Sequence, residues 1–195
     1  MKKESQVIFD KNVIEFVTVA AEFCAFLERA ESMKRSTFVD TTLKILPLLY
    51  LKASMLPKCE MIGDESPETY VTEEIYEVLR INLASILAEK DDYLEVFLPD
   101  MAYSDEPIKK NISEDLADIY QDIKDFIFVF QLGLNETMND SLAICQENFG
   151  LLWGQKLVNT MRALHDVKYS PKARGEDEEE EEYEPENNED CHCED

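Results

Sequence analysis

The sequence SEDLADIYQDIKDFIFVF, residues 113–130, carries the clearest structural signal in the chain. Its apolar residues recur at spacings of three and four, at Leu116, Ile119, Tyr120, Ile123, Phe126, Ile127 and Phe130. This period is typical of one face of an α-helix and differs from the alternation of a strand. Ser113 is the predicted N-cap, and Gly133 lies where helices commonly end in a left-handed residue. The stretch therefore predicts an amphipathic helix.

The same period recurs in four other segments, which span about residues 12–27, 36–56, 72–87 and 136–165. Thr72 is the predicted N-cap of the third segment, and Glu73 and Glu74 follow it at the positive end of the helix dipole. No single helix of this kind can bury its apolar face alone, so neighbouring helices must share one core. The chain is therefore predicted to be all-α, an up-and-down bundle of about five helices.

Residues 91–112 give a weaker signal. Leu94, Val96 and Leu98 alternate with other residues as in a short strand. No partner strand is recognisable elsewhere in the sequence, and an isolated strand cannot satisfy its backbone hydrogen bonds. A short helix and a loop are therefore predicted for this segment.

Charge divides the 195-residue chain into two parts. It has 43 acidic and 19 basic residues and a formal charge of −24. Residues 176–195 contain 13 of the acidic residues and no Lys or Arg, which leaves 30 acidic against 19 basic residues in 1–175. A segment so charged and so poor in apolar residues cannot offset the entropy of ordering. We predict a helical domain over residues 1–170 and a disordered acidic tail over residues 171–195.

Composition also narrows the classes of partner and compartment. A net negative charge repels a phosphate backbone, so nucleic acid is not an expected partner. The longest apolar runs, residues 45–51 and 126–130, are far shorter than the ~18–20 residues of a membrane span. Acidic residues interrupt the N-terminal segment, which does not resemble a signal peptide. The five cysteines fit a reducing compartment. A cytoplasmic location without membrane insertion is expected.

Four carboxylates follow the apolar face of the 113–130 helix, at Asp115, Asp118, Asp122 and Asp125. They lie on one flank, because their spacings of three and four keep them on the same side of a helix. If this helix and the next form an antiparallel hairpin, Trp153 and Lys156 reach the level of Asp115 and Asp118. The favoured interpretation is a solvated, partly ion-paired flank. A divalent cation held by Asp118 and Asp122 is the weaker alternative.

Cys191, His192 and Cys193 form a second weak candidate for metal binding, in the acidic tail. Adjacent residues cannot easily take three corners of one tetrahedron, and zinc sites usually separate their cysteines by two to four residues. An accidental cluster is the favoured interpretation, and loose cation binding by the tail is the alternative. No cofactor is predicted.

Two stretches carry a resemblance to a known family: DLADIYQD at residues 115–122, and WGQKL at 153–157 followed by RALH at 162–165. Over about residues 10–169 the chain resembles the bacterial helical family known as domain of unknown function 5063. The residues that match the family pattern are Asp118, Tyr120, Asp122, Trp153, Gly154 and His165. The resemblance implies an all-helical fold and one functional cluster at these positions, but no activity.

No complete catalytic set is recognisable. Two histidines cannot supply a three-histidine metal site, and neither a Gly-rich phosphate loop nor a Gly-x-Ser-x-Gly elbow occurs. The chain is therefore interpreted as a non-enzymatic interaction or regulatory module with an unidentified protein partner. The alternative is a metal-dependent hydrolase or a small-ligand-binding bundle that uses the carboxylates of the 113–130 helix. Trp153 is expected in the core, with its indole N–H bonded to a carboxylate.

Overall fold

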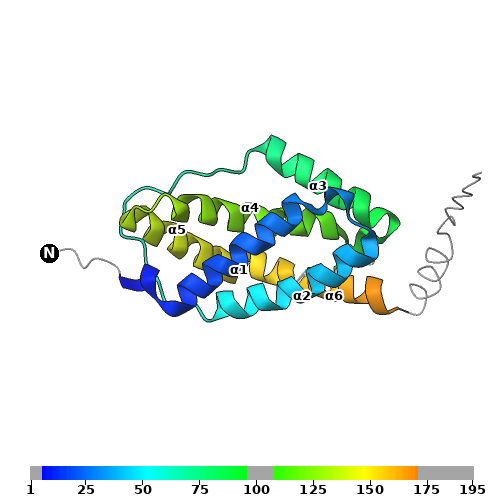
Figure 1. The fold of residues 1–195 in the computed structure, drawn as a ribbon, viewed down its shortest axis with the longest axis horizontal. Coiled ribbons are helices and arrows are strands. Elements are labelled where there is room, and N and C mark those ends of the chain that lie inside the picture. Colours follow the sequence, from blue (N-terminus) through cyan, green and yellow to red (C-terminus); the bar gives the residue numbers. More distant parts are fainter. Residues whose placement is uncertain (1–5, 96–107, 171–195) are drawn as a thin grey trace, which may run out of the picture.

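The computed structural model describes residues 6–95 and 108–170. Its helices are α1 (Lys11–Glu28), α2 (Arg35–Ser54), α3 (Glu73–Leu87), α4 (Ile112–Gln131), α5 (Asn135–Asn148) and α6 (Gly154–Tyr169). A π-helical segment, Phe149–Trp153, joins α5 to α6 without a break. With α5, the π-helical segment and α6 taken as one long helix, the prediction of an all-α bundle of about five helices is confirmed (Figure 1).

Helix α4 is the centre of the bundle. It packs against α1, α3, α5 and α6, and Figure 1 shows it running through the middle of the molecule. Leu116, Ile119 and Ile123 are fully buried, in agreement with the periodicity of the 113–130 stretch. Gly133 follows α4 with a φ of 75°, a left-handed conformation that glycine adopts without a steric penalty. The predicted helix end is therefore confirmed, and the chain turns there into α5.

Helices α2 and α6 lie side by side and antiparallel. Near one end of the pair, the rings of Tyr50 and Phe149 are 5.2 Å apart between centroids. Near the other end, Lys168 forms an ion pair with Asp40. This pairing places the π-helical segment beside the C-terminal half of α2.

The prediction of a helix and a loop for residues 91–112 is wrong at the two described ends of this segment. Strands β1 (Asp92–Leu94) and β2 (Lys109–Asn111) form a small antiparallel ladder, in which Tyr93 lies opposite Lys110. The partner strand has the sequence Lys-Lys-Asn, which has no apolar alternation and so gives no periodic signal. Val96 and Leu98 lie outside the described residues.

The structure agrees with one of the two predicted helix N-caps and differs from the other. The Thr72 hydroxyl accepts a hydrogen bond from the Ile75 N–H, so the predicted N-cap of α3 is confirmed. The predicted N-cap of α4 at Ser113 is wrong, because Ser113 lies inside the first turn of the helix. The Asp91 carboxylate accepts hydrogen bonds from both the N–H and the hydroxyl of Ser113. The capping group of α4 therefore comes from the residue just before β1.

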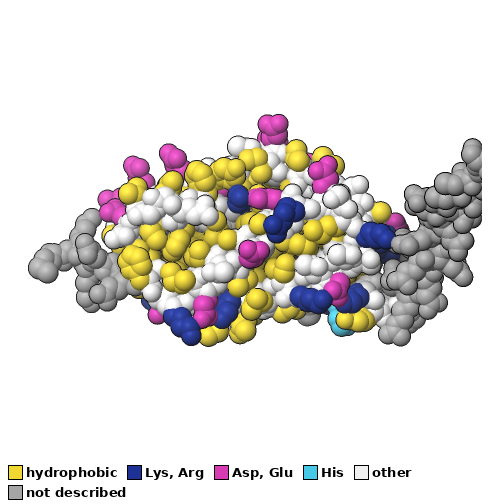
Figure 2. Space-filling view, in the orientation of Figure 1, with side chains coloured by type: hydrophobic (Ala, Val, Ile, Leu, Met, Phe, Trp, Pro, Cys, Tyr) yellow, Lys and Arg dark blue, Asp and Glu magenta, His cyan; other side chains and the backbone are white. Residues whose placement is uncertain are grey.

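The predicted acidic tail, residues 171–195, lies outside the described part of the chain. None of the helices in residues 6–95 and 108–170 combines the length and the apolar character that a bilayer crossing requires. On the face shown in Figure 2, acidic and basic side chains are interspersed among apolar ones.

Candidate functional site

A groove of about 360 Å³ opens beside the acidic flank of α4. Its other walls come from α5, the π-helical segment, the start of α6 and the loop at residues 67–69. Its charged and amide side chains are Glu68, Asp118, Gln121, Asp122, Asp125, Asn148 and Lys156, and apolar parts of its walls come from Phe126, Val129, Ile144 and Leu152. We call this feature the central groove. Three of the four carboxylates singled out in the sequence line it.

Asp118 connects three helices at one end of the central groove. Its carboxylate accepts a hydrogen bond of 2.8 Å from the hydroxyl of Tyr76 on α3 and forms an ion pair with Lys156 on α6. Burial raises the pKa of Tyr76, and the hydrogen bond to the Asp118 carboxylate raises it further. The predicted proximity of Lys156 to this end of α4 is confirmed.

Asp122 lies one turn further along α4. The side-chain amide of Asn148 donates a hydrogen bond of 2.6 Å to its carboxylate. Burial raises the pKa of Asp122, the hydrogen bond from Asn148 opposes that effect, and the charges of Asp125 and Asp118 add to it. The charge of Lys156 also lowers the pKa, so it partly offsets the negative charges of Asp125 and Asp118 at this carboxylate.

The two remaining carboxylates of the flank hold other segments against α4. Asp125 accepts hydrogen bonds of 2.7 and 2.8 Å from the backbone N–H groups of Tyr70 and Val71, which lie just before α3. Asp115 is buried outside the central groove and accepts a hydrogen bond of 2.5 Å from the hydroxyl of Tyr93 on β1. Each of the four carboxylates therefore has its own partner, from a different part of the chain.

Trp153 is fully buried, so its predicted place in the core is confirmed. Its expected bond to a carboxylate is wrong, because the indole N–H donates to the backbone carbonyl of Cys145 at 3.2 Å. The expectation assumed 3.6 residues per turn from residue 136 to residue 165. The π-helical segment, whose last residue is Trp153, breaks that register. The indole consequently bonds to the backbone of α5, which continues into this segment without a break.

Gly154 completes the π-helical segment. Its N–H donates to the carbonyl of Phe149, five residues earlier. A Cβ atom at this position would overlap that same carbonyl oxygen and press on the Phe149 ring. Glycine is needed here because the backbone approaches too closely for any side chain.

Tyr120 and His165 lie away from the central groove. The hydroxyl of Tyr120 donates a hydrogen bond of 2.8 Å to Glu28 on α1. His165 is exposed near the end of α6, where its ring lies 4.6 Å from that of Tyr169. It lines a separate hollow between α2 and α6. The structure therefore brings Asp118 and Asp122 together but does not join all the family-pattern positions in one cluster.

Asn148 and Glu68 line the central groove but were not predicted from the sequence. The antiparallel pairing that predicted Lys156 could also have predicted Asn148, because residues of α5 lie opposite the C-terminal half of α4. Glu68 lies in a loop with no periodic signal. The described residues contain no group of three or more His, Cys, Asp or Glu side chains placed to hold a metal ion. Cys191, His192 and Cys193 lie outside them.

The pH dependence of stability is expected to reveal the burial of Asp115. Burial raises the pKa of this carboxyl from 3.8 to about 6, although the hydrogen bond from Tyr93 opposes the shift. The folded state therefore holds the proton more tightly than the unfolded state. The stabilising contribution is complete below about pH 4 and is lost as the pH rises through about 6.

Asp115→Asn should remove this contribution. Urea unfolding between pH 4 and pH 7 should show the free energy of unfolding of the unsubstituted protein falling relative to that of the variant. Glu114→Gln changes an exposed neighbouring carboxylate and should leave the original pH profile in place. Parallel profiles for the unsubstituted protein and Asp115→Asn would contradict the assignment.

Comparison with known proteins assigns a family. The model of the family described as "Domain of unknown function (DUF5063)" matches residues 7–170. The crystal structure of protein BF1032 from Bacteroides fragilis is 93% identical in sequence, with a TM-score of 0.79. That match covers 87% of this chain and 99% of the other. No curated protein matches. The family match spans most of the sequence, and the chain belongs to the DUF5063 family.

Proposed function

We propose that this protein is a non-enzymatic interaction module whose central groove binds a positively charged, partly apolar segment of another protein. The observation that carries the proposal is the composition of the groove, in which carboxylates on successive turns of α4 lie beside apolar side chains. Lysine and arginine side chains combine the same two properties, an aliphatic stem and a charged end.

The electrostatics of the groove favour such a segment. Burial raises the pKa of Asp122, and its like-charged neighbours Asp125 and Asp118 raise it further. Lys156 is the only lysine or arginine among the described residues that line the groove, and it already pairs with Asp118. A cation from a partner would reduce the repulsion among Asp118, Asp122 and Asp125. Its attraction to these carboxylates would be stronger than in bulk water, because the site is partly desolvated.

The hydrogen bonds of the groove support recognition more than catalysis. Asp118 and Asp125 hold neighbouring segments in place through Tyr76 and through backbone N–H groups. Such carboxylates form a rigid wall, which lowers the entropic cost of binding. A general base or metal ligand, in contrast, needs free access to its reacting partner.

A pair of matched peptides tests the proposal. The first is a short helical peptide of Lys and Leu, and the second has Gln in place of every Lys. Calorimetric titration of the full chain should show saturable binding of the Lys peptide only, with amide NMR shifts concentrated around the central groove. Binding should weaken as salt increases, because ions screen the charges.

Asp122→Asn and Glu114→Gln form a matched pair of variants, since each removes one negative charge from α4. Asp122→Asn should weaken peptide binding about tenfold, the effect of ~1.4 kcal/mol. Glu114→Gln should bind like the unsubstituted protein. Equal binding by both variants, or NMR shifts confined to the acidic residues 176–195, would overturn the proposal.

The metal-dependent alternative has its own test. A metal bound only by the folded protein raises the melting temperature by mass action. If millimolar Mg²⁺ or Mn²⁺ stabilises the unsubstituted protein and has no effect on the Asp118→Asn, Asp122→Asn double variant, a metal site would replace the interaction module as the function of the groove. Equal responses would favour the interaction module.

A further inference from the structure

Two of the six described α-helices, α2 and α6, carry more basic than acidic residues. Each has three Lys or Arg residues and one Asp. The other four, α1, α3, α4 and α5, each have more acidic than basic residues. Because α2 and α6 pack side by side, the basic residues are segregated onto one pair of helices in a chain of formal charge −24.

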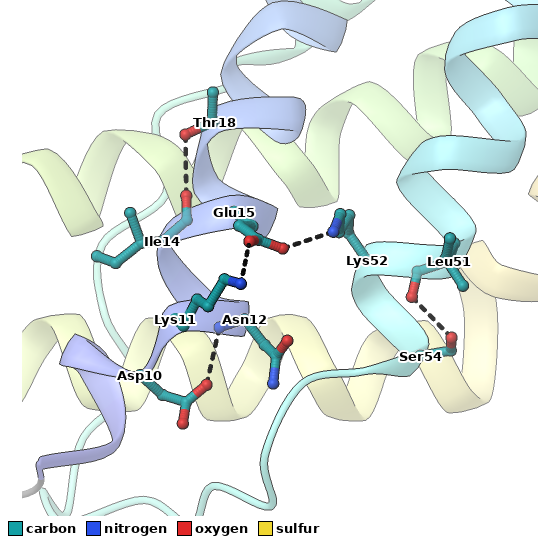
Figure 3. Close-up of polar contacts among 9 residues, drawn as sticks. All are labelled: Asp10, Lys11, Asn12, Ile14, Glu15, Thr18, Leu51, Lys52 and Ser54. Atoms are coloured by element: carbon teal, nitrogen blue, oxygen red, sulfur yellow. Dashed lines mark hydrogen bonds and ion pairs between the residues drawn. The ribbon is translucent and has the colours of Figure 1, made fainter.

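Three of these six basic residues are neutralised by carboxylates outside the two helices. Arg35 pairs with Glu89, Lys156 with Asp118, and Lys52 with Glu15 on α1, as Figure 3 shows. These three add no net charge to the surface of the pair.

The other three basic residues, Lys44, Arg162 and Lys168, keep an excess of positive charge. Lys44 and Lys168 share a single carboxylate, Asp40. Arg162 is exposed, and within the described residues no carboxylate pairs with its guanidinium. The excess remains when Asp166, the one acidic residue of α6, is counted. We call the surface formed by Lys44, Arg162 and Lys168 the α2–α6 basic face.

The hollow between α2 and α6 has a volume of about 490 Å³ and contains Arg162. His165 and Tyr169 lie along the same side of α6, three and seven residues further on. The lining is completed by apolar side chains, Leu43, Val158 and Met161. None of the described residues that line the hollow is acidic. It therefore suits an anionic segment that also carries an apolar or aromatic side chain.

We propose that the acidic segment at residues 176–195 of the same chain binds the α2–α6 basic face and covers the hollow. The segment has 13 acidic residues and no Lys or Arg, so this face attracts it and the four acidic helices repel it. Tyr183, between Glu182 and Glu184, places a ring beside carboxylates, which matches a guanidinium beside apolar side chains. While bound, the segment shields the face from other anionic molecules. This contact does not rest on the proposed function of the central groove.

The acidic segment is close enough to reach the whole hollow. It begins seven residues after Tyr169, the last residue of α6. Seven extended residues span up to about 23 Å. The part of α6 from Tyr169 back to Val158 is only about 17 Å long. A contact within one chain has an effective concentration in the millimolar range, so several weak exposed charge contacts suffice to populate it.

A spin label on the acidic segment tests the proposal in the full chain. Cys59→Ser and Cys193→Ser leave Cys191 as the accessible thiol, because Cys24 and Cys145 are buried. A nitroxide on Cys191 should broaden the amide NMR signals of α6 and α2 around the hollow at low salt. The broadening should fall in ~0.5 M NaCl, because ions screen the attraction.

Arg162→Glu and Lys11→Glu form a matched pair of variants, since each reverses one exposed positive charge. Arg162→Glu should reduce the broadening around the hollow about threefold, the population change expected for one exposed charge contact. Changing each of Glu178–Glu182 to Gln should reduce it from the side of the segment. Lys11→Glu, at the opposite end of the bundle from the end of α6 (Figure 1), should leave it unchanged.

Three results would overturn this contact. The first is equal broadening in Arg162→Glu and Lys11→Glu. The second is broadening that persists in high salt. The third is broadening limited in every variant to the last residues of α6, which would report only the attachment of the segment to that helix. The Gln changes lie outside the described residues, so a folding defect in Arg162→Glu does not decide the outcome.

Discussion

Trp153→Ala is expected to lower the free energy of unfolding by about 3–5 kcal/mol, the range for large aromatic-to-alanine changes in a core. The indole is fully buried, and its ring centroid lies 4.7 Å from that of Phe149. Alanine would leave a cavity at the junction of the π-helical segment and α6. It would also remove the hydrogen bond to the carbonyl of Cys145. Urea unfolding followed by circular dichroism measures the change without relying on tryptophan fluorescence.

Leu134→Ala is the control, because Leu134 is an exposed apolar side chain outside the core and should contribute less than about 0.5 kcal/mol. Native fluorescence gives an independent check, since Trp153 is the only tryptophan. A buried indole emits toward the blue and resists acrylamide. Red-shifted, easily quenched emission, or a variant as stable as the control, would contradict the core role.

Asp91→Ala is expected to have the second largest effect, a loss of about 2–4 kcal/mol, because it leaves buried donors without an acceptor. The carboxylate accepts hydrogen bonds of 2.7 Å from both the N–H and the hydroxyl of Ser113, and both residues are buried. Asn111 donates a longer bond of 3.3 Å to the same carboxylate. Hydrogen exchange should therefore accelerate in the first turn of α4.

Asp92→Ala is the matched control for Asp91→Ala. The two residues are adjacent and carry the same charge, but Asp92 is exposed and pairs with Lys109 at the surface. Exposed ion pairs contribute about 0–1 kcal/mol, so this variant should be nearly as stable as the unsubstituted protein. Similar losses from both variants would show that Asp91 acts through charge alone and not as the cap of α4.

The π-helical segment matters for the proposed interaction of the central groove. Leu152 lines this groove, and Leu151 beside it is exposed. A π-helical segment changes the direction of successive side chains relative to a regular helix. Gly154 is required for its geometry, because the carbonyl of Phe149 excludes a side chain there. The same local distortion therefore shapes one wall of the central groove.

The helices and the core residues of α4 follow from the sequence alone. Leu116, Ile119 and Ile123 are buried where their period predicts, because burial of an apolar face is the dominant favourable term in folding and its pattern is local. The end of α4 at Gly133 and the start of α3 at Thr72 also rest on local backbone chemistry. These features need no knowledge of which segments meet.

The polar contacts depend on which distant segments meet, and only the tertiary structure decided them. Asp91 caps α4 from 22 residues away, and Tyr76 reaches Asp118 across 42 residues. Hydrogen-bond partners do not recur at a regular spacing along the chain. The sequence therefore predicted neither of these two pairs, nor the pairing of β1 with β2. The sequence located a row of carboxylates on one helix face. Packing alone decided which partner each carboxylate has and that three of the four line the central groove, because a buried charge bonds to the donors that the fold places beside it.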